Sequence, residues 1–167
     1  MILVVVTKKV ANHEAYEICK TNDIPCITTK WLPGLLTNFE TIMKNVKKLQ
    51  TYKEQQITGE WDKFVKHERI QLSKEMVKLE KLYGGLLNLK KKPDALFIVD
   101  IKKEKNAVTE AQKNGLPIIA VADTNSNPDQ VNVPIVINDD SPAVVQSVVH
   151  DLLETYVAGR KESSEKK

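Results

Sequence analysis

Ile2-Leu3-Val4-Val5-Val6 is the stretch that decides the fold, because a short, continuous, mostly β-branched apolar run is typical of a strand covered on both faces. Similar runs recur at residues 95–99, 118–122 and 134–137. Strands buried on both faces belong to parallel sheets. The repetition therefore predicts an α/β domain built on a parallel sheet.

Helical patterns separate these runs. Residues 11–22 carry apolar side chains at helical spacing, and Pro25 then precedes a short second strand expected at residues 26–29. Residues 104–114 and 142–158 are the other expected helices of the sheet domain. Strands that alternate with helices in this way predict right-handed crossovers between parallel neighbours.

The connection between the second and third strands is too long for an ordinary crossover. Narrow apolar stripes run on either side of Thr58-Gly59 and predict an antiparallel coiled-coil hairpin reaching roughly 30 Å from the sheet. The first stripe consists of Phe39, Ile42, Val46 and Leu49, and the second of Val65, Leu72, Met76, Leu79 and Tyr83. We expect Gly84-Gly85 to end the second helix in left-handed geometry.

These patterns divide the chain into three parts. Residues 1–29 and 93–158 are predicted to form the α/β domain, and residues 30–92 the inserted coiled-coil hairpin. Residues 159–167 carry no apolar side chain and are predicted to form a flexible tail.

Charge is unevenly distributed along the chain. Residues 41–92 contain 13 Lys and Arg against 6 Asp and Glu, a formal charge of +7, whereas the remainder carries −4. Clustered cations neutralise phosphates and release counterions, so this asymmetry favours nucleic acid as the partner of the middle segment. The same lysines also keep a projecting coiled coil soluble, and charge alone does not separate the two interpretations.

Several classes of function lack their sequence signals. Cys19 and Cys26 have no further ligands at metal-binding spacing, and no apolar run approaches the roughly 20 residues that span a bilayer. The first strand is followed by Thr7-Lys8-Lys9 rather than a glycine-rich phosphate loop, and no histidine accompanies a nucleophile elbow. We therefore expect a cytosolic protein with reduced thiols and without metal, cofactor, membrane partner or small-molecule substrate.

Acidic residues leave one enzymatic alternative open. Asp100 and Asp123 end predicted strands, and Asp139 follows the last one, so their carboxylates are expected at the carboxyl edge of the sheet. Such a cluster can hold magnesium for phosphoryl transfer or nucleotide binding. The commoner use of these residue types is to shape loops and helix starts. A third possibility is a non-catalytic adaptor whose hairpin recognises protein.

Longer motifs point to a known family. The segment from residue 30 to 39 reads Lys-Trp-Leu-Pro-Gly-Leu-Leu-Thr-Asn-Phe, and resembles the Arg-Trp-Leu-Gly-Gly-x-Leu-Thr-Asn-Phe motif of the bacterial-type small-subunit ribosomal protein S-two family. Residues 93–117, with Glu110-Ala111, resemble its second signature, and Asp123-Thr124-Asn125 follows at the expected interval. The stretch that usually precedes the family's first strand has no counterpart here.

The resemblance implies a flavodoxin-like three-layer α/β/α domain with strand order 2-1-3-4-5 and a coiled-coil insertion. It further implies a non-enzymatic structural constituent of the small ribosomal subunit, located between head and body, where it binds ribosomal RNA and neighbouring ribosomal proteins and supports translation initiation. A ribosome-bound, cytoplasmic protein of bacterial type is expected, and an organelle is the alternative location. The residues predicted to contact RNA are Lys8, Lys9, Lys30, Trp31, Asn38, Lys44, Lys47, Lys48, Lys90, Lys91 and Lys92.

Overall fold

The computed structural model describes residues 1–165 and contains one all-parallel, five-stranded sheet in the order β2-β1-β3-β4-β5. The strands are β1 (Ile2–Val5), β2 (Cys26–Ile27), β3 (Ala95–Val99), β4 (Ile118–Ala122) and β5 (Val133–Val136). Central β1 pairs with both β2 and β3, with Val4 opposite Cys26 on one side and Phe97 on the other. The predicted fold class and strand order are confirmed.

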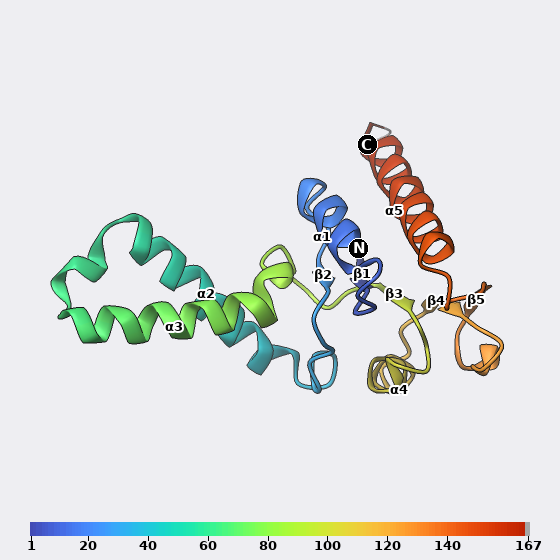
Figure 1. Ribbon diagram of the computed structural model, residues 1–167, viewed down its shortest axis with the longest axis horizontal. Coiled ribbons are helices and arrows are strands. Elements are labelled where there is room, and N and C mark those ends of the chain that lie inside the picture. The colour runs from blue at the N-terminus through green and yellow to red at the C-terminus, as the bar shows by residue number, and fades with distance from the viewer. Residues whose placement is uncertain (166–167) are drawn as a thin grey trace.

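Helices cover both faces of the sheet. Helices α1 (Asn12–Thr21) and α5 (Pro142–Glu165) lie on one face, and α4 (Lys105–Lys113) lies on the other (Figure 1). Leu3 and Val5 of β1 pack into the core on the α4 side, whereas Val4 packs into the core beneath α1 and α5. Because successive side chains of a strand point to opposite faces, the unbroken apolar run supplies both cores.

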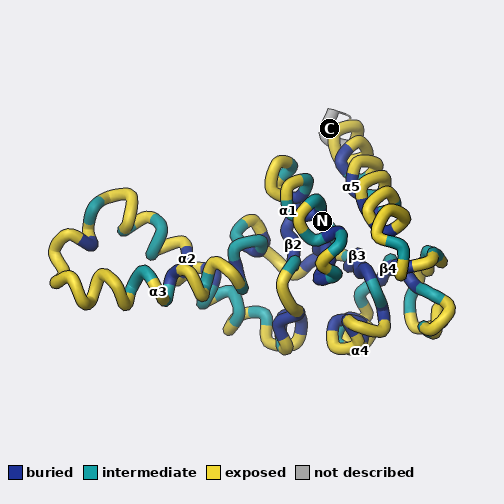
Figure 2. Tube along the Cα trace, viewed as in Figure 1, coloured by how far each residue is buried: buried dark blue, intermediate teal, exposed yellow. Residues whose placement is uncertain are grey.

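Helices α2 (Phe39–Ile57) and α3 (Lys66–Tyr83) form an arm that projects away from the sheet (Figure 1). Val46, Leu49 and Met76 are buried in the seam between them. The end of the arm farthest from the sheet is mostly exposed (Figure 2). There Val65 is 67% exposed, and its predicted place in the seam is wrong. Val65 precedes α3 in extended backbone geometry, so it does not share the helix's periodicity.

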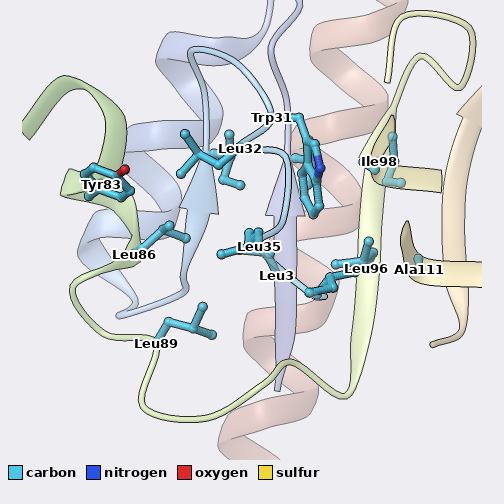
Figure 3. Close-up of a cluster of buried hydrophobic side chains, with 14 of the residues drawn as sticks. Leu3, Trp31, Leu32, Leu35, Tyr83, Leu86, Leu89, Leu96, Ile98 and Ala111 are labelled. Carbon is cyan, nitrogen blue, oxygen red and sulfur yellow. The ribbon is translucent and has the colours of Figure 1, made fainter. Parts of the chain in front are cut away.

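The two glycines that end α3 act differently from the prediction. Gly84 has φ −56° and ψ −40°, so the expected left-handed geometry is wrong, and the chain continues into the short 3-10 helix η2 (Gly84–Leu86). Gly85 is required for space, because a Cβ atom there would lie 2.1 Å from the carbonyl oxygen of Cys26 in β2. The arm therefore returns to the sheet in direct backbone contact with β2. Leu86 and Leu89 then enter the core (Figure 3).

The last helix is longer than its apolar stripe. We expected α5 to end near Ala158 with a flexible tail after it, but the helix continues to Glu165. The guanidinium group of Arg160 donates a hydrogen bond to the carbonyl of Asn22 at 3.0 Å, and it lies 6.0 Å from the ring centroid of Tyr156. The hydrogen bond from Arg160 to the residue that caps α1 therefore favours helix beyond Ala158. Residues 166–167 of the predicted tail lie outside the described residues.

Candidate nucleic-acid interface

A loop between β2 and α2 connects the sheet to the arm, and one carboxylate holds it. The indole N–H of Trp31 donates to Oε1 of Glu110 at 3.1 Å, and the backbone N–H of Gly34 donates to the same oxygen at 2.7 Å. The backbone N–H of Leu36 donates to Oε2 at 3.1 Å. Sequence reasoning included Glu110 only within a family motif and missed this role.

Trp31 belongs to the core and not to a binding surface. Its side chain is 6% exposed and packs in the cluster that contains Leu35 and Leu96 (Figure 3). A buried ring that donates its N–H to Glu110 offers no face to a nucleic-acid base. The prediction that Trp31 contacts RNA is therefore corrected: Trp31 packs the root of the arm.

The three lysines predicted to share one side of α2 are all exposed, but they are not equivalent. Lys48 forms an ion pair with Glu75 of α3, with Nζ 2.6 Å from Oε1, and its ammonium group lies 5.4 Å from the ring centroid of Tyr52. Within the described part of the chain, Lys44 and Lys47 make no ion pair. These two lysines are therefore the cations of this face that remain available to a phosphate.

The electrostatics around Lys48 follow from its contacts. Its hydrogen bond to Glu75 raises the pKa of the Lys48 ammonium group above its ordinary value. The same bond, together with the hydroxyl of Tyr52, which donates to Oε2 of Glu75 at 3.0 Å, lowers the pKa of the Glu75 carboxyl. Both groups remain charged, and Glu75 offsets the charge that Lys48 would present to a polyanion.

Two further cations of the arm are also paired. Lys53 lies 2.6 Å from Glu80, and Arg69 lies 3.1 Å from Asp62. The other lysines of α2, α3 and their connection make no ion pair among the described residues and are exposed. They are Lys44, Lys47, Lys63, Lys66, Lys74, Lys78 and Lys81. The arm thus keeps a cationic surface after its internal pairs are formed.

The remaining predicted contacts do not form one surface with each other. Lys9 and Lys30 are exposed and follow β1 and β2, at the carboxyl edge of the sheet. The exposed run at residues 90–92 precedes β3, at the opposite edge, and Lys91 there lies 3.1 Å from Asp94. Asn38 is exposed at the start of α2, where its side-chain oxygen accepts a hydrogen bond from Thr41 at 2.8 Å.

Lys8 is part of the carboxyl edge itself. Its Nζ lies 3.0 Å from Oδ2 of Asp139, whose side chain is buried, and it also donates to the backbone carbonyl of Asp139. Nearby, the hydroxyl of Thr7 donates to buried Glu104, and Lys103 donates to the carbonyl of Thr7 at 2.9 Å. These bonds tie the ends of β1, β3 and β5 together.

The arrangement of carboxylates does not support the magnesium-dependent alternative. Asp100 accepts a hydrogen bond from the backbone N–H of Lys103 at 2.9 Å, Asp123 accepts one from Thr124 at 2.7 Å, and Asp139 is paired with lysine. Among residues 1–165, no three His, Cys, Asp or Glu side chains are grouped so that they would hold a metal ion. Asp100 and Asp123 bond the backbone of their own loops, as these residue types commonly do, whereas Asp139 is the counter-ion of Lys8.

Comparison with known proteins finds a matching family and similar sequences. The sequence pattern of a family described as Ribosomal protein S2 matches residues 1–159. A protein named Small ribosomal subunit protein uS2 from Wolinella succinogenes is 40% identical over 159 residues, which cover 95% of this chain and 59% of that relative. The protein of the same name from Helicobacter acinonychis (strain Sheeba) is 39% identical over 160 residues, covering 96% of this chain and 65% of the relative.

A third relative of that name, from Helicobacter hepaticus, is 36% identical over 165 residues, with 99% of this chain and 62% of the relative covered. The chain thus spans about three fifths of the length of these curated relatives. No helix in the described range is both long and apolar enough to cross a membrane. The resemblance seen in the sequence motifs is confirmed by these matches, and the chain belongs to the Ribosomal protein S2 family.

Proposed function

We propose that this chain is a structural, non-catalytic component of the small ribosomal subunit that binds ribosomal RNA with the exposed lysines of its arm. The observation that carries the proposal is the pair Lys44 and Lys47, which are exposed and make no ion pair with any described residue, on a helical arm that projects from the sheet. The relatives' shared name, Small ribosomal subunit protein uS2, supports the proposal that this chain acts in the small ribosomal subunit.

The geometry of the arm suits binding to a folded polyanion. Helix α2 has 19 residues, which corresponds to about 28 Å of helix at 1.5 Å per residue. An arm of this length carries its cations away from the carboxylates of the sheet domain. Phosphates then meet a local positive potential, and the release of their counterions supplies affinity without base-specific contacts.

Under this proposal the hairpin at residues 30–92 is the RNA-binding insertion of the sheet domain. Lys9, Lys30 and the lysines at 90–92 would contribute from the two edges of the sheet. Neighbouring small-subunit ribosomal proteins are the expected protein partners, at a position between head and body that supports translation initiation. The protein would be ribosome-bound in the cytoplasm.

The test is a salt titration of the affinity for small-subunit ribosomal RNA. Affinity of the wild type should fall linearly on a logarithmic plot as salt rises, and the Lys44→Glu/Lys47→Glu variant should show a slope smaller by roughly 1.4 to 1.8. Lys105→Glu/Lys113→Glu on α4 introduces the same charge change outside the proposed surface and should keep the wild-type slope. A flat response of the wild type would refute RNA binding by cations.

Assembly provides the second readout. In cell lysate, wild-type protein should sediment with small subunits through a moderate-salt wash, and the Lys44→Glu/Lys47→Glu variant should be depleted from them. Urea unfolding of both double variants checks that each remains folded. If the arm variant is incorporated to the same extent as the α4 variant, Lys44 and Lys47 face solvent and do not contribute to incorporation.

A further inference from the structure

The arm meets the sheet domain at two connections, and both contribute buried side chains to the core. The returning chain is held by packing, with Gly85 against the backbone of Cys26 and Leu86 in the core. The outgoing loop also packs in the core, through Leu35 and Leu36, and in addition both oxygens of the Glu110 carboxylate accept hydrogen bonds from it. The outgoing connection therefore combines packing with hydrogen bonds that converge on one side chain, Glu110.

Glu110 belongs to a helix that is packed against the sheet. It lies in α4, which packs on the sheet through the buried side chains of Ala107, Val108 and Ala111. From this position the partly buried carboxylate faces the loop, and within the described residues it makes no ion pair. Its charge is therefore balanced by N–H dipoles of the loop, and hydrogen bonds to a charged acceptor are roughly twice as strong as those between neutral groups.

The loop adopts a shape that brings its donors to one acceptor. Gly34 has φ +89°, a left-handed conformation that glycine adopts without strain. With this turn, the backbone N–H groups of Gly34 and Leu36 point at the two carboxylate oxygens while the Trp31 indole adds a third donor. Two residues after Leu36 the chain reaches Asn38, which immediately precedes α2.

We propose that Glu110 is a positioning residue that fixes the direction of the α2–α3 arm relative to the sheet. The physical link runs from the sheet through α4 to the carboxylate, and from the carboxylate through the 31–36 loop to the first turn of α2. Its consequence for binding rests on the proposed function. If loss of Glu110 leaves the arm in its binding direction for about a tenth of the time, the apparent Kd for RNA rises about tenfold.

Spin labels measure the direction of the arm directly in the free protein. Cysteines introduced at the exposed positions Glu68 on α3 and Glu154 on α5 report the distance from the outer part of the arm to the sheet domain. The two native cysteines are buried, and the protein without introduced cysteines gives the labelling background. Glu110→Ala should broaden the distance distribution and shift its mean.

Two further variants separate positioning from general destabilisation. Glu110→Gln keeps one oxygen for Trp31 and Gly34 but turns an amide donor toward the N–H of Leu36, so it should broaden the distribution less than alanine does. Val121→Ala lowers stability from a buried position in β4 and should leave the distribution unchanged. Equal broadening in Val121→Ala, or a wild-type distribution in folded Glu110→Ala, overturns the proposal. If the alanine variant does not fold, an unchanged distribution in Glu110→Gln overturns it.

RNA affinity is measured separately on the same proteins without labels. A wild type that does not bind ribosomal RNA refutes the proposed function, while the label distances still decide whether Glu110 positions the arm. Weaker RNA binding by Glu110→Ala, whose arm lysines are intact, supports both the proposed function and the positioning role of Glu110. Unchanged binding together with a broadened distribution supports positioning and shows that the direction of the arm does not limit RNA affinity.

Discussion

Gly84 and Gly85 are neighbours for which alanine substitutions should have opposite effects. At Gly85 a Cβ atom would lie 2.1 Å from the carbonyl oxygen and 3.0 Å from the sulfur of Cys26. At Gly84 the nearest atom would be Cγ of Glu80 at 3.4 Å, in a flexible side chain. Gly84 also has right-handed helical geometry, which alanine adopts readily.

The magnitudes follow from these distances. Carbon and carbonyl oxygen come no closer than about 3.3 Å in ordinary contacts, so Gly85→Ala must displace the return of the arm from β2 by roughly 1 Å. Overpacking of this kind costs about 1–3 kcal/mol, and the upper end applies because the obstructing atom is backbone. Gly84→Ala should instead stabilise by about 0.4–1 kcal/mol, since it restricts the unfolded chain.

Urea unfolding followed by circular dichroism measures both variants. Gly85→Ala should lower the free energy of unfolding by about 3 kcal/mol, which corresponds to a fall in Tm of roughly 6 to 12 °C for a chain of this size. The slope of the urea dependence should stay unchanged, because the surface exposed on unfolding is the same. If Gly85→Ala unfolds within about 0.5 kcal/mol of the wild type, the close backbone contact between the arm and β2 is refuted.

Other substitutions test the ion pairs and the seam. Lys48 lowers the pKa of the Glu75 carboxyl below its ordinary value of 4.5. Above pH 4.5 their exposed ion pair therefore stabilises the folded state by about 0.5 kcal/mol, and this contribution disappears as the pH falls through the lowered pKa. Thermal unfolding of wild type and Glu75→Gln should therefore converge in acid, and a constant difference would contradict the pair. Asp139→Asn should cost about 2 kcal/mol in urea unfolding, because its lysine partner loses the counter-charge, and an unchanged midpoint would argue against the ion pair. Met76→Ala should cost about 2 kcal/mol or more, whereas exposed Val65→Ala should change stability by less than about 0.5 kcal/mol, and equal losses would contradict the described seam.

Local patterns predict the sheet well. The runs at β3 and β4 are predicted to the residue, because strands covered on both faces are apolar throughout and end where a polar residue or turn begins. The errors occur where local rules compete with packing. Gly85 is needed for its close contact with Cys26, although a glycine pair after a helix resembles a left-handed cap. Helix α5 likewise continues beyond its apolar stripe, where Arg160 donates a hydrogen bond to the carbonyl of Asn22.

The candidate interface was only partly predictable. Charge and helical spacing place Lys44, Lys47 and Lys48 on one exposed side of α2, as the structure has them. The pairing of Lys48 with Glu75 joins residues 27 positions apart and depends on how α3 lies against α2. Helical spacing along one helix carries no information on that relation, so the loss of one cation from the surface was not foreseen.

The sequence by itself determined the parallel α/β sheet, the projecting hairpin and the cationic character of that hairpin, since apolar period and charge are local properties of the chain. Tertiary structure alone decided which lysines stay unpaired, that Trp31 is buried, and that Glu110 holds the loop at the root of the arm. The Glu110 contacts join residues 74 to 79 positions apart. Such contacts form only when α4 and the loop pack on the same face of the sheet, which no local pattern encodes.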